Sequence, residues 1–234
     1  FLKAQGLAGK PVADIRIDGA GKKVTRSDNC RVSDLSVSSD NLTFTYEAKS
    51  LPYPIDTSYY DNEKHTQADA LSVIPFMDEM NYEGLSVSGL SDGYYGLTIG
   101  GEFIGRFTAR ELERGINMAL LQNTPQYKQA MKIRQMNEER WLKERKMREF
   151  YWVEYNLMRK TGMLWACNEA AVDTLRKYRP HDIFLQWNGD LWLQYMHKGI
   201  REDCVNEQQD LVNQIYEQNK PIPLRIEIKK FTDL

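Results

Sequence analysis

The sequence predicts an α+β fold, in which a β-rich, sandwich-like module precedes a helical segment with one long helix and a C-terminal strand that returns to the sheet. Three observations carry this prediction. Apolar and polar residues alternate with period two before Phe107, a long helical pattern follows Thr108, and the alternation returns after Pro221. We expect the four parts at residues 1–9, 10–107, 108–219 and 220–234.

The chain opens with the end of a helix and continues with strands. We expect Phe1 to Leu7 to form the last turns of a helix, with Gly6 as its C-terminal stop. Leu42, Phe44 and Tyr46 then alternate with polar residues, as in a strand that has one face in water. Two prolines in 51–55 remove backbone donors, so we expect an extended connection there and a polar surface loop at 56–67.

A tight hairpin should end the β-rich module. Gly100 and Gly101 lie between two apolar runs, and both positions of such a loop need a positive φ angle. Thr108 and Glu111 then match a capping box, in which each side chain bonds the other residue's backbone N–H. We therefore expect a helix from about Ala109 to Asn123. Its apolar face would consist of Leu112, Ile116 and Leu120, with Gly115 tolerated inside.

The helical segment is expected to contain one long helix and several shorter stretches. No strong helix breaker occurs between Pro125 and Gly162. Opposite charges recur four positions apart in 137–149, as on a helix face in water, whereas 150–158 is apolar or aromatic nearly all round, which indicates burial. Shorter stretches follow at 163–178, at 183–197 with an interruption at Asn188-Gly189, and at 201–218, and the strand pattern at 224–228 should join the first sheet.

Composition excludes several classes of protein. Of 234 residues, 41% are hydrophobic and 27% are charged, as in ordinary soluble globular proteins. The formal net charge of −2 argues against a nucleic-acid binder, and no apolar run approaches the ~20 residues of a membrane span. Cys30, Cys167 and Cys204 form no CxxC pair, so we expect no zinc site. Residues 85–123 hold no Gly-rich loop between a strand and a helix that could cradle a phosphate, and we expect no cofactor. One disulfide with one free thiol stays open, and so does the redox compartment.

Candidates for catalysis are few because the chain holds three histidines. His65 is expected in a surface loop. His181 is next to Asp182 and is the best local candidate for a His-acid pair, although such neighbours after a proline are more often a helix cap. A metal site of His181, His197 and a carboxylate has no ligand spacing to support it. An enzyme that works through His181 and Asp182 is therefore the least favoured reading.

Aromatic residues offer a different kind of site. Trp165, Trp187, Trp192 and Tyr195 could form a stacking platform for a sugar, although aromatic residues at helical spacing are more often core. We retain Trp187, Trp192, Tyr195 and His181 as candidate ligand contacts. No residue is assigned as catalytic, cofactor-binding or metal-binding.

Four stretches of the chain are similar to a known family. They are FLKAQGL, PYPI, GLSDGYYGLTIGGEFIGRFTARELERGINMALLQNTP and IYEQNKPIPLRIEIKKF. Together they resemble the C-terminal part of bacterial SGNH hydrolases, also called GDSL-type esterases. The resemblance touches both ends of the chain, and the third stretch is its most specific part.

The resemblance implies a serine esterase whose active site lies outside this chain. Members of that family carry the nucleophile in Gly-Asp-Ser, an oxyanion-hole Gly and Asn, and a catalytic Asp-x-x-His. Here Gly189-Asp190 is followed by Leu191, and no Asp stands three residues before any of the histidines. The resemblance thus implies an upstream catalytic α/β domain, of which residues 1–9 would end a helix, and a secreted or periplasmic protein.

Two further hypotheses about function stand beside the enzyme reading. In the first, the chain is the non-catalytic C-terminal accessory region of an acyl-ester or carbohydrate-ester hydrolase, and it packs against the upstream catalytic domain and borders its substrate cleft. The alternative is an autonomous carbohydrate-binding or protein-assembly module without enzymatic activity, whose ligand would be a carbohydrate or acylated carbohydrate.

Overall fold

The computed structural model describes residues 4–6, 10–58 and 65–231. The chain divides into two compact units, which we describe separately. The β unit comprises Phe1–Ile133 and Gln218–Leu234, and the helical unit comprises Arg134–Glu217. The expected helix end at Phe1 to Leu7 lies mostly outside the described residues, as does the middle of the expected loop at 56–67.

The β unit contains two sheets. The first has the order β2-β1-β5-β8, in which β1 and β5 are parallel and the other neighbours are antiparallel. Its strands are β1 (Ala13–Asp18), β2 (Lys23–Asp28), β5 (Glu83–Ser88) and β8 (Ile116–Asn117). The second is antiparallel throughout, with the order β3-β4-β9-β6-β7. Its strands are β3 (Cys30–Val37), β4 (Asn41–Ala48), β6 (Tyr94–Ile99), β7 (Glu102–Thr108) and β9 (Leu224–Lys230).

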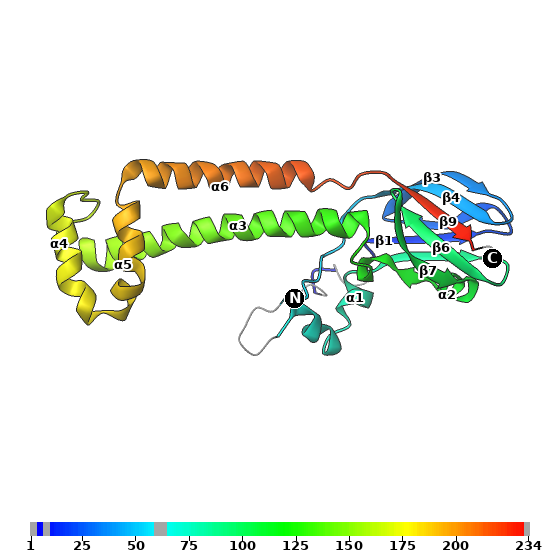
Figure 1. The fold of residues 1–234 in the computed structure, drawn as a ribbon, viewed down its shortest axis with the longest axis horizontal. Helices are drawn as coiled ribbons and strands as arrows, with labels where there is room; N and C mark the ends of the chain where they lie inside the picture. Colours follow the sequence, from blue (N-terminus) through cyan, green and yellow to red (C-terminus); the bar gives the residue numbers. More distant parts are fainter. Residues whose placement is uncertain (1–3, 7–9, 59–64, 232–234) are drawn as a thin grey trace. The chain divides into compact units, whose positions relative to one another are not determined.

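The last strand joins the sheet of the first half, as the sequence predicts. Figure 1 shows β9 in red between β4 and β6, and it hydrogen-bonds to both. Leu224, Ile226 and Ile228 are buried, whereas the residues between them are more exposed. The alternating pattern therefore inserts the C-terminal strand into the middle of the sheet, and the α+β prediction is confirmed.

One hydrophobic core is shared by the two sheets. The first sheet contributes Ile15, Ile17 and Leu85, and the second contributes Phe44 and Ile226, all of which are almost completely buried. Each such side chain stabilises the fold by about 1.5–3 kcal/mol relative to exposure in water. Burial of one face of each sheet gives the sandwich-like arrangement that the strand pattern implies.

The hairpin and the capping box are confirmed, but the helix after them is shorter than expected. Gly100 and Gly101 have φ angles of 60° and 85°, and they connect β6 to β7. The Thr108 hydroxyl accepts a hydrogen bond from the Glu111 backbone N–H at 3.1 Å, and the Glu111 carboxylate accepts one from the Thr108 N–H at 2.7 Å. Helix α2 (Ala109–Arg114) starts there and ends at Gly115.

The prediction of one helix from Ala109 to Asn123 is wrong because Gly115 adopts a φ of 95°. The next two residues pair with the edge of β5 as strand β8, and η2 (Met118–Leu120) is a single 3₁₀ turn. The Asn117 side chain accepts the Glu83 backbone N–H at 2.9 Å. Leu120 is 56% exposed and does not extend the apolar face of α2.

Replacing Gly115 with alanine should destabilise the β unit. A residue with a Cβ atom is strained at this φ angle, and the expected cost is about 1–3 kcal/mol of unfolding free energy. Chemical denaturation of the Gly115→Ala variant measures this cost. Gly101→Asn is a matched control, because asparagine tolerates a positive φ angle and nothing lies near a Cβ there. Equal stability of wild type and Gly115→Ala would contradict the account of why α2 ends.

Two short helices complete the β unit before β5. They are η1 (Gln67–Ser72) and α1 (Phe76–Glu79), and they follow the extended connection at 51–55. The Asn81 side chain fixes this connection, because it accepts the Tyr53 backbone N–H at 2.7 Å and donates to the Tyr53 carbonyl at 2.9 Å. The proline-rich stretch forms no strand, as predicted.

The long helix is α3 (Pro125–Val153), which continues as a π-helical turn, η3 (Glu154–Met158). Its charged stretch carries the expected pairs four residues apart, such as Arg145 with Glu149 at 2.7 Å. Phe150, Val153 and Met158 are buried in the core of the helical unit. The sequence therefore predicted correctly which part of this helix is exposed to solvent and which part is buried.

The rest of the helical unit consists of α4 (Glu169–Tyr178), η4 (Arg179–His181), α5 (Ile183–Tyr195) and α6 (Lys198–Gln218). The helix expected from residue 163 begins only at Glu169, because Trp165 has a φ of 62° and Asn168 caps the helix start. Helix α5 is not interrupted at Asn188-Gly189. A Cβ on Gly189 would lie 3.1 Å from Arg179 Nε, so the glycine lets this side chain cross the helix closely.

Candidate functional site

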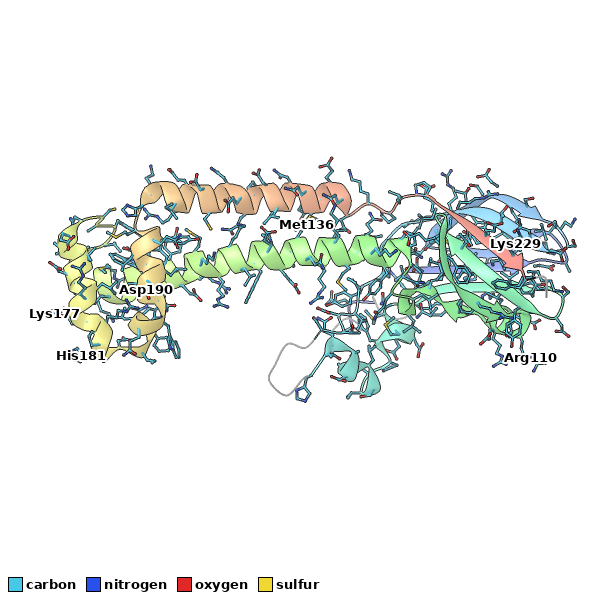
Figure 2. The ribbon with its side chains drawn as sticks, in the orientation of Figure 1. Arg110, Met136, Lys177, His181, Asp190 and Lys229 are labelled. Atoms are coloured by element: carbon cyan, nitrogen blue, oxygen red, sulfur yellow. The ribbon has the colours of Figure 1, made fainter. Side chains whose placement is uncertain are left out.

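The four candidate ligand contacts do not share one surface. Trp192 has no exposed surface and Tyr195 is buried, so both belong to the core of the helical unit. Trp187 is 67% exposed, and His181 is exposed where the chain passes from α4 to α5 (Figure 2). Contact of Trp187 or His181 with a ligand stays a prediction.

A buried carboxylate holds the core around Trp192. Glu154, in the π-helical turn, is 1% exposed, and it accepts the Trp192 indole N–H at 2.8 Å. Its other oxygen accepts the backbone N–H of Trp165 at 2.8 Å. Sequence reasoning missed Glu154, although a single acidic residue within the apolar stretch 150–158 was a signal of a buried polar partner.

A groove of about 360 Å³ lies beside this core. Its lining includes the buried side chains of Leu157 and Leu185, and Trp152 and Tyr178 supply aromatic surface. The complete lining is Trp152, Asn156, Leu157, Lys160, Thr161, Tyr178, His181, Asp182 and Leu185. This volume is within the range of small-molecule sites, which are typically largely apolar with a few polar groups.

Local structure fixes the polar rim of the groove. The Asp182 carboxylate caps α5 by accepting the backbone N–H groups of Phe184 at 2.8 Å and Leu185 at 3.3 Å. This cap places His181 in the 3₁₀ turn directly before the helix. Thr161 donates to the Leu157 carbonyl at 3.0 Å, which holds the turn beside Lys160. The cap that the sequence favoured for His181 and Asp182 is therefore made by Asp182.

Exposed aromatic rings extend from the groove along α5. Trp152 and Phe184 have ring centroids 5.2 Å apart, and Phe184 and Trp187 follow at 5.5 Å. Phe184 is 49% exposed. An apolar surface of this kind typically marks a place where a ligand or another protein binds. Trp187 thus belongs to a surface row with Phe184 and Trp152, and Trp192 does not.

Neither His181 nor His197 forms a hydrogen bond with an acidic side chain among the described residues. In the described part of the chain no hydrogen bond joins His181 to Asp182, whose carboxylate is used by the helix cap. His197 instead lies 3.3 Å from the Cys167 sulfur through Nδ1. No group of three or more potential metal ligands occurs among the described residues. All three cysteines are free thiols.

A second buried carboxyl group lies in the β unit. Glu83 has no exposed surface, and it accepts hydrogen bonds from the Tyr46 hydroxyl at 2.8 Å and the Gln126 amide at 3.3 Å. Burial raises the pKa of Glu83 to about 7, while these two donors oppose the rise. Its second oxygen has no partner among the described residues. Glu83 thus links β5, β4 and the first turn of α3.

Comparison with known proteins corrects the family expectation. Residues 131–220 match the family model of the diltiazem deacetylase C-terminal helical domain. The solved structure of BT4096, described as a gut microbial diltiazem-metabolizing enzyme, is similar over 99% of this chain, with 37% identity and a TM-score of 0.91. No curated protein sequence matches the chain. The residues that match the family model include Glu154 and all residues that line the groove.

These findings contradict the resemblance to SGNH hydrolases, because the matched family model describes a domain of diltiazem deacetylase and the matched structure is a diltiazem-metabolizing enzyme. A secreted or periplasmic location was implied by that resemblance alone and loses its support. The chain spans about half of the solved enzyme, 52% of its length. No described helix has both the length and the apolar character needed to cross a membrane. The helical part of this chain is therefore similar to the C-terminal helical domain of a deacetylating enzyme, and not to part of an SGNH hydrolase.

Proposed function

We propose that the chain is the non-catalytic accessory region of an enzyme that hydrolyses ester bonds. The observation that carries this proposal is the 37% identity, over almost the whole chain, to half of a diltiazem-metabolizing enzyme. Deacetylation of an ester requires a nucleophile, a general base and donors that stabilise the oxyanion. The partner we expect is a catalytic domain of the same protein that supplies these groups.

The surroundings of His181 support a non-catalytic role for this region. Its neighbour Asp182 bonds the start of α5, so it is not available to orient the imidazole as an acid does in a catalytic triad. The groove beside His181 nevertheless has the size and lining of a ligand site. The helical unit would therefore bind and position substrate at the border of a cleft whose chemistry is performed elsewhere.

Removal of the helical unit from the full-length enzyme tests the proposal. The Gln129 amide donates to the backbone carbonyls of Gln218 at 2.9 Å and Lys220 at 2.8 Å, so the two ends of the excised part lie close together. A short Gly/Ser linker can therefore replace 134–217. We expect KM for p-nitrophenyl acetate to rise roughly tenfold or the substrate range to change, because binding contacts are lost.

Circular dichroism and thermal unfolding of the excised variant would establish that the remaining protein is folded. A second variant, lacking only 137–149, shortens the charged part of α3 and should also change KM or the substrate range. Unaltered kinetics in both folded variants would argue against a role of the helical unit in substrate binding.

A second candidate function is carbohydrate binding, which the 67% exposure of Trp187 favours. An exposed tryptophan can stack on a sugar ring. Binding of the chain to a glycan array, lost on Trp187→Ala, would support an autonomous carbohydrate-binding module. Absence of binding at this residue would leave the esterase proposal as the better account.

A further inference from the structure

The groove of the helical unit has the volume and the lining to accept an aromatic ring. Trp152 and Tyr178 line it from two different helices, and the buried Leu157 and Leu185 add apolar lining. Aromatic walls favour an aromatic ligand, because ring pairs gain from edge-to-face or offset packing in addition to the area that they bury. An aliphatic ligand would gain the buried area alone.

The polar rim of the groove favours a negative charge. Neither the Lys160 ammonium nor the His181 ring makes a hydrogen bond or ion pair within the described chain. The carboxylate at the rim, Asp182, accepts two backbone N–H groups at the start of α5, a 13-residue helix. The partial positive charge of this helix terminus offsets part of the negative charge of Asp182. Lys160 therefore remains as a cation of the rim that makes no ion pair within the described chain.

We propose that this groove binds an aromatic carboxylate, with the ring between Trp152 and Tyr178 and the carboxylate at Lys160 and His181. The inference deepens the proposed function: the ester substrates of the enzyme would be acetyl esters of alcohols or phenols that carry an aromatic ring and an acidic group. Charge complementarity selects this ligand over a neutral aromatic compound.

Titration calorimetry of the full-length enzyme with 4-hydroxybenzoate tests the groove without any reaction. We expect Lys160→Gln to weaken binding roughly tenfold, since a charge-assisted hydrogen bond is lost. Tyr178→Ala should weaken it by a similar factor through loss of the ring contact. Lys146→Gln is the matched control, because Lys146 is an exposed lysine of α3 outside the groove. Both replaced groove side chains are exposed, so the variants should remain folded.

Two related ligands separate the contributions of ring and charge. Cyclohexanecarboxylate keeps the charge without aromaticity, benzyl alcohol keeps the ring without charge, and both should bind at least tenfold more weakly than 4-hydroxybenzoate. Undetectable binding of 4-hydroxybenzoate at millimolar concentration, equal binding by the groove variants and wild type, or equal binding of all three ligands would each overturn the proposal.

Hydrolysis kinetics with a charged and a neutral ester distinguish this inference from the proposed function. With 4-acetoxybenzoate and phenyl acetate as substrates, Lys160→Gln should raise KM for the charged ester alone. If both esters are hydrolysed and neither KM responds, the groove assignment fails while the esterase proposal stands. If no ester is hydrolysed but 4-hydroxybenzoate binding depends on Lys160, the esterase proposal fails and the ligand site stands.

Discussion

Replacing Glu83 with glutamine is expected to stabilise the protein by about 3 kcal/mol at pH 8 and to leave its stability almost unchanged at pH 4. The folded-state pKa of Glu83 is about 7, above its ordinary value of 4.5. The folded state therefore binds more protons than the unfolded state between these values, so stability falls as the pH rises through this range and then stays level. Glutamine cannot ionise, and it keeps an acceptor for Tyr46 and Gln126.

Urea denaturation of wild type and Glu83→Gln at pH 4, 6 and 8 measures this effect. The difference in unfolding free energy should appear between pH 4 and pH 8. Glu113→Gln serves as the control, because Glu113 is an exposed glutamate of α2. A Glu83→Gln difference that is the same at all three pH values would mean that Glu83 does not hold its proton in the folded protein.

Loss of the Glu154 carboxylate is expected to destabilise the helical unit by about 3–5 kcal/mol. In Glu154→Ala, the Trp192 indole N–H and the Trp165 backbone N–H lose their buried acceptor. Each unpaired donor contributes a desolvation cost of roughly 1–3 kcal/mol. Glu154→Gln retains one acceptor oxygen and should cost less than half as much.

Near-ultraviolet circular dichroism reports the packing of Trp192, and chemical denaturation gives the stability. Glu149→Ala is a suitable control, because Glu149 forms a partly exposed ion pair with Arg145 worth less than about 1 kcal/mol. If Glu154→Ala were no less stable than this control, the carboxylate would not be the organising group of the helical core.

Short sequence patterns predicted the strands, the turn and the helix start that depend on neighbouring residues. The alternation at Leu224, Ile226 and Ile228 identified β9, and the paired glycines identified the hairpin before β7. The capping box located the start of α2 to the residue. The end of α2 could not be predicted in the same way. Gly115 adopts a positive φ angle there, and Ile116 and Asn117 pair with the edge of β5 instead of continuing the helix.

The candidate site was only partly accessible to sequence reasoning. His181 was identified as a ligand candidate and lines the groove, but the side chains that complete it come from distant positions such as Trp152 and Lys160. The indole of Trp192 donates to Glu154, which lies 38 positions earlier in the sequence. A contact at this separation cannot be predicted from helical periodicity. Aromatic spacing alone could not separate exposed Trp187 from buried Trp192, because both lie on α5.

The most direct test of the central claim is p-nitrophenyl acetate hydrolysis by the 234-residue chain, measured beside the longer enzyme of which we propose it is a part. Intact mass would verify that the chain sample is 27.3 kDa. We expect turnover by the longer enzyme and none above the buffer rate by the chain. Turnover by the chain itself, abolished by His181→Ala, would contradict this expectation and make this region the catalyst.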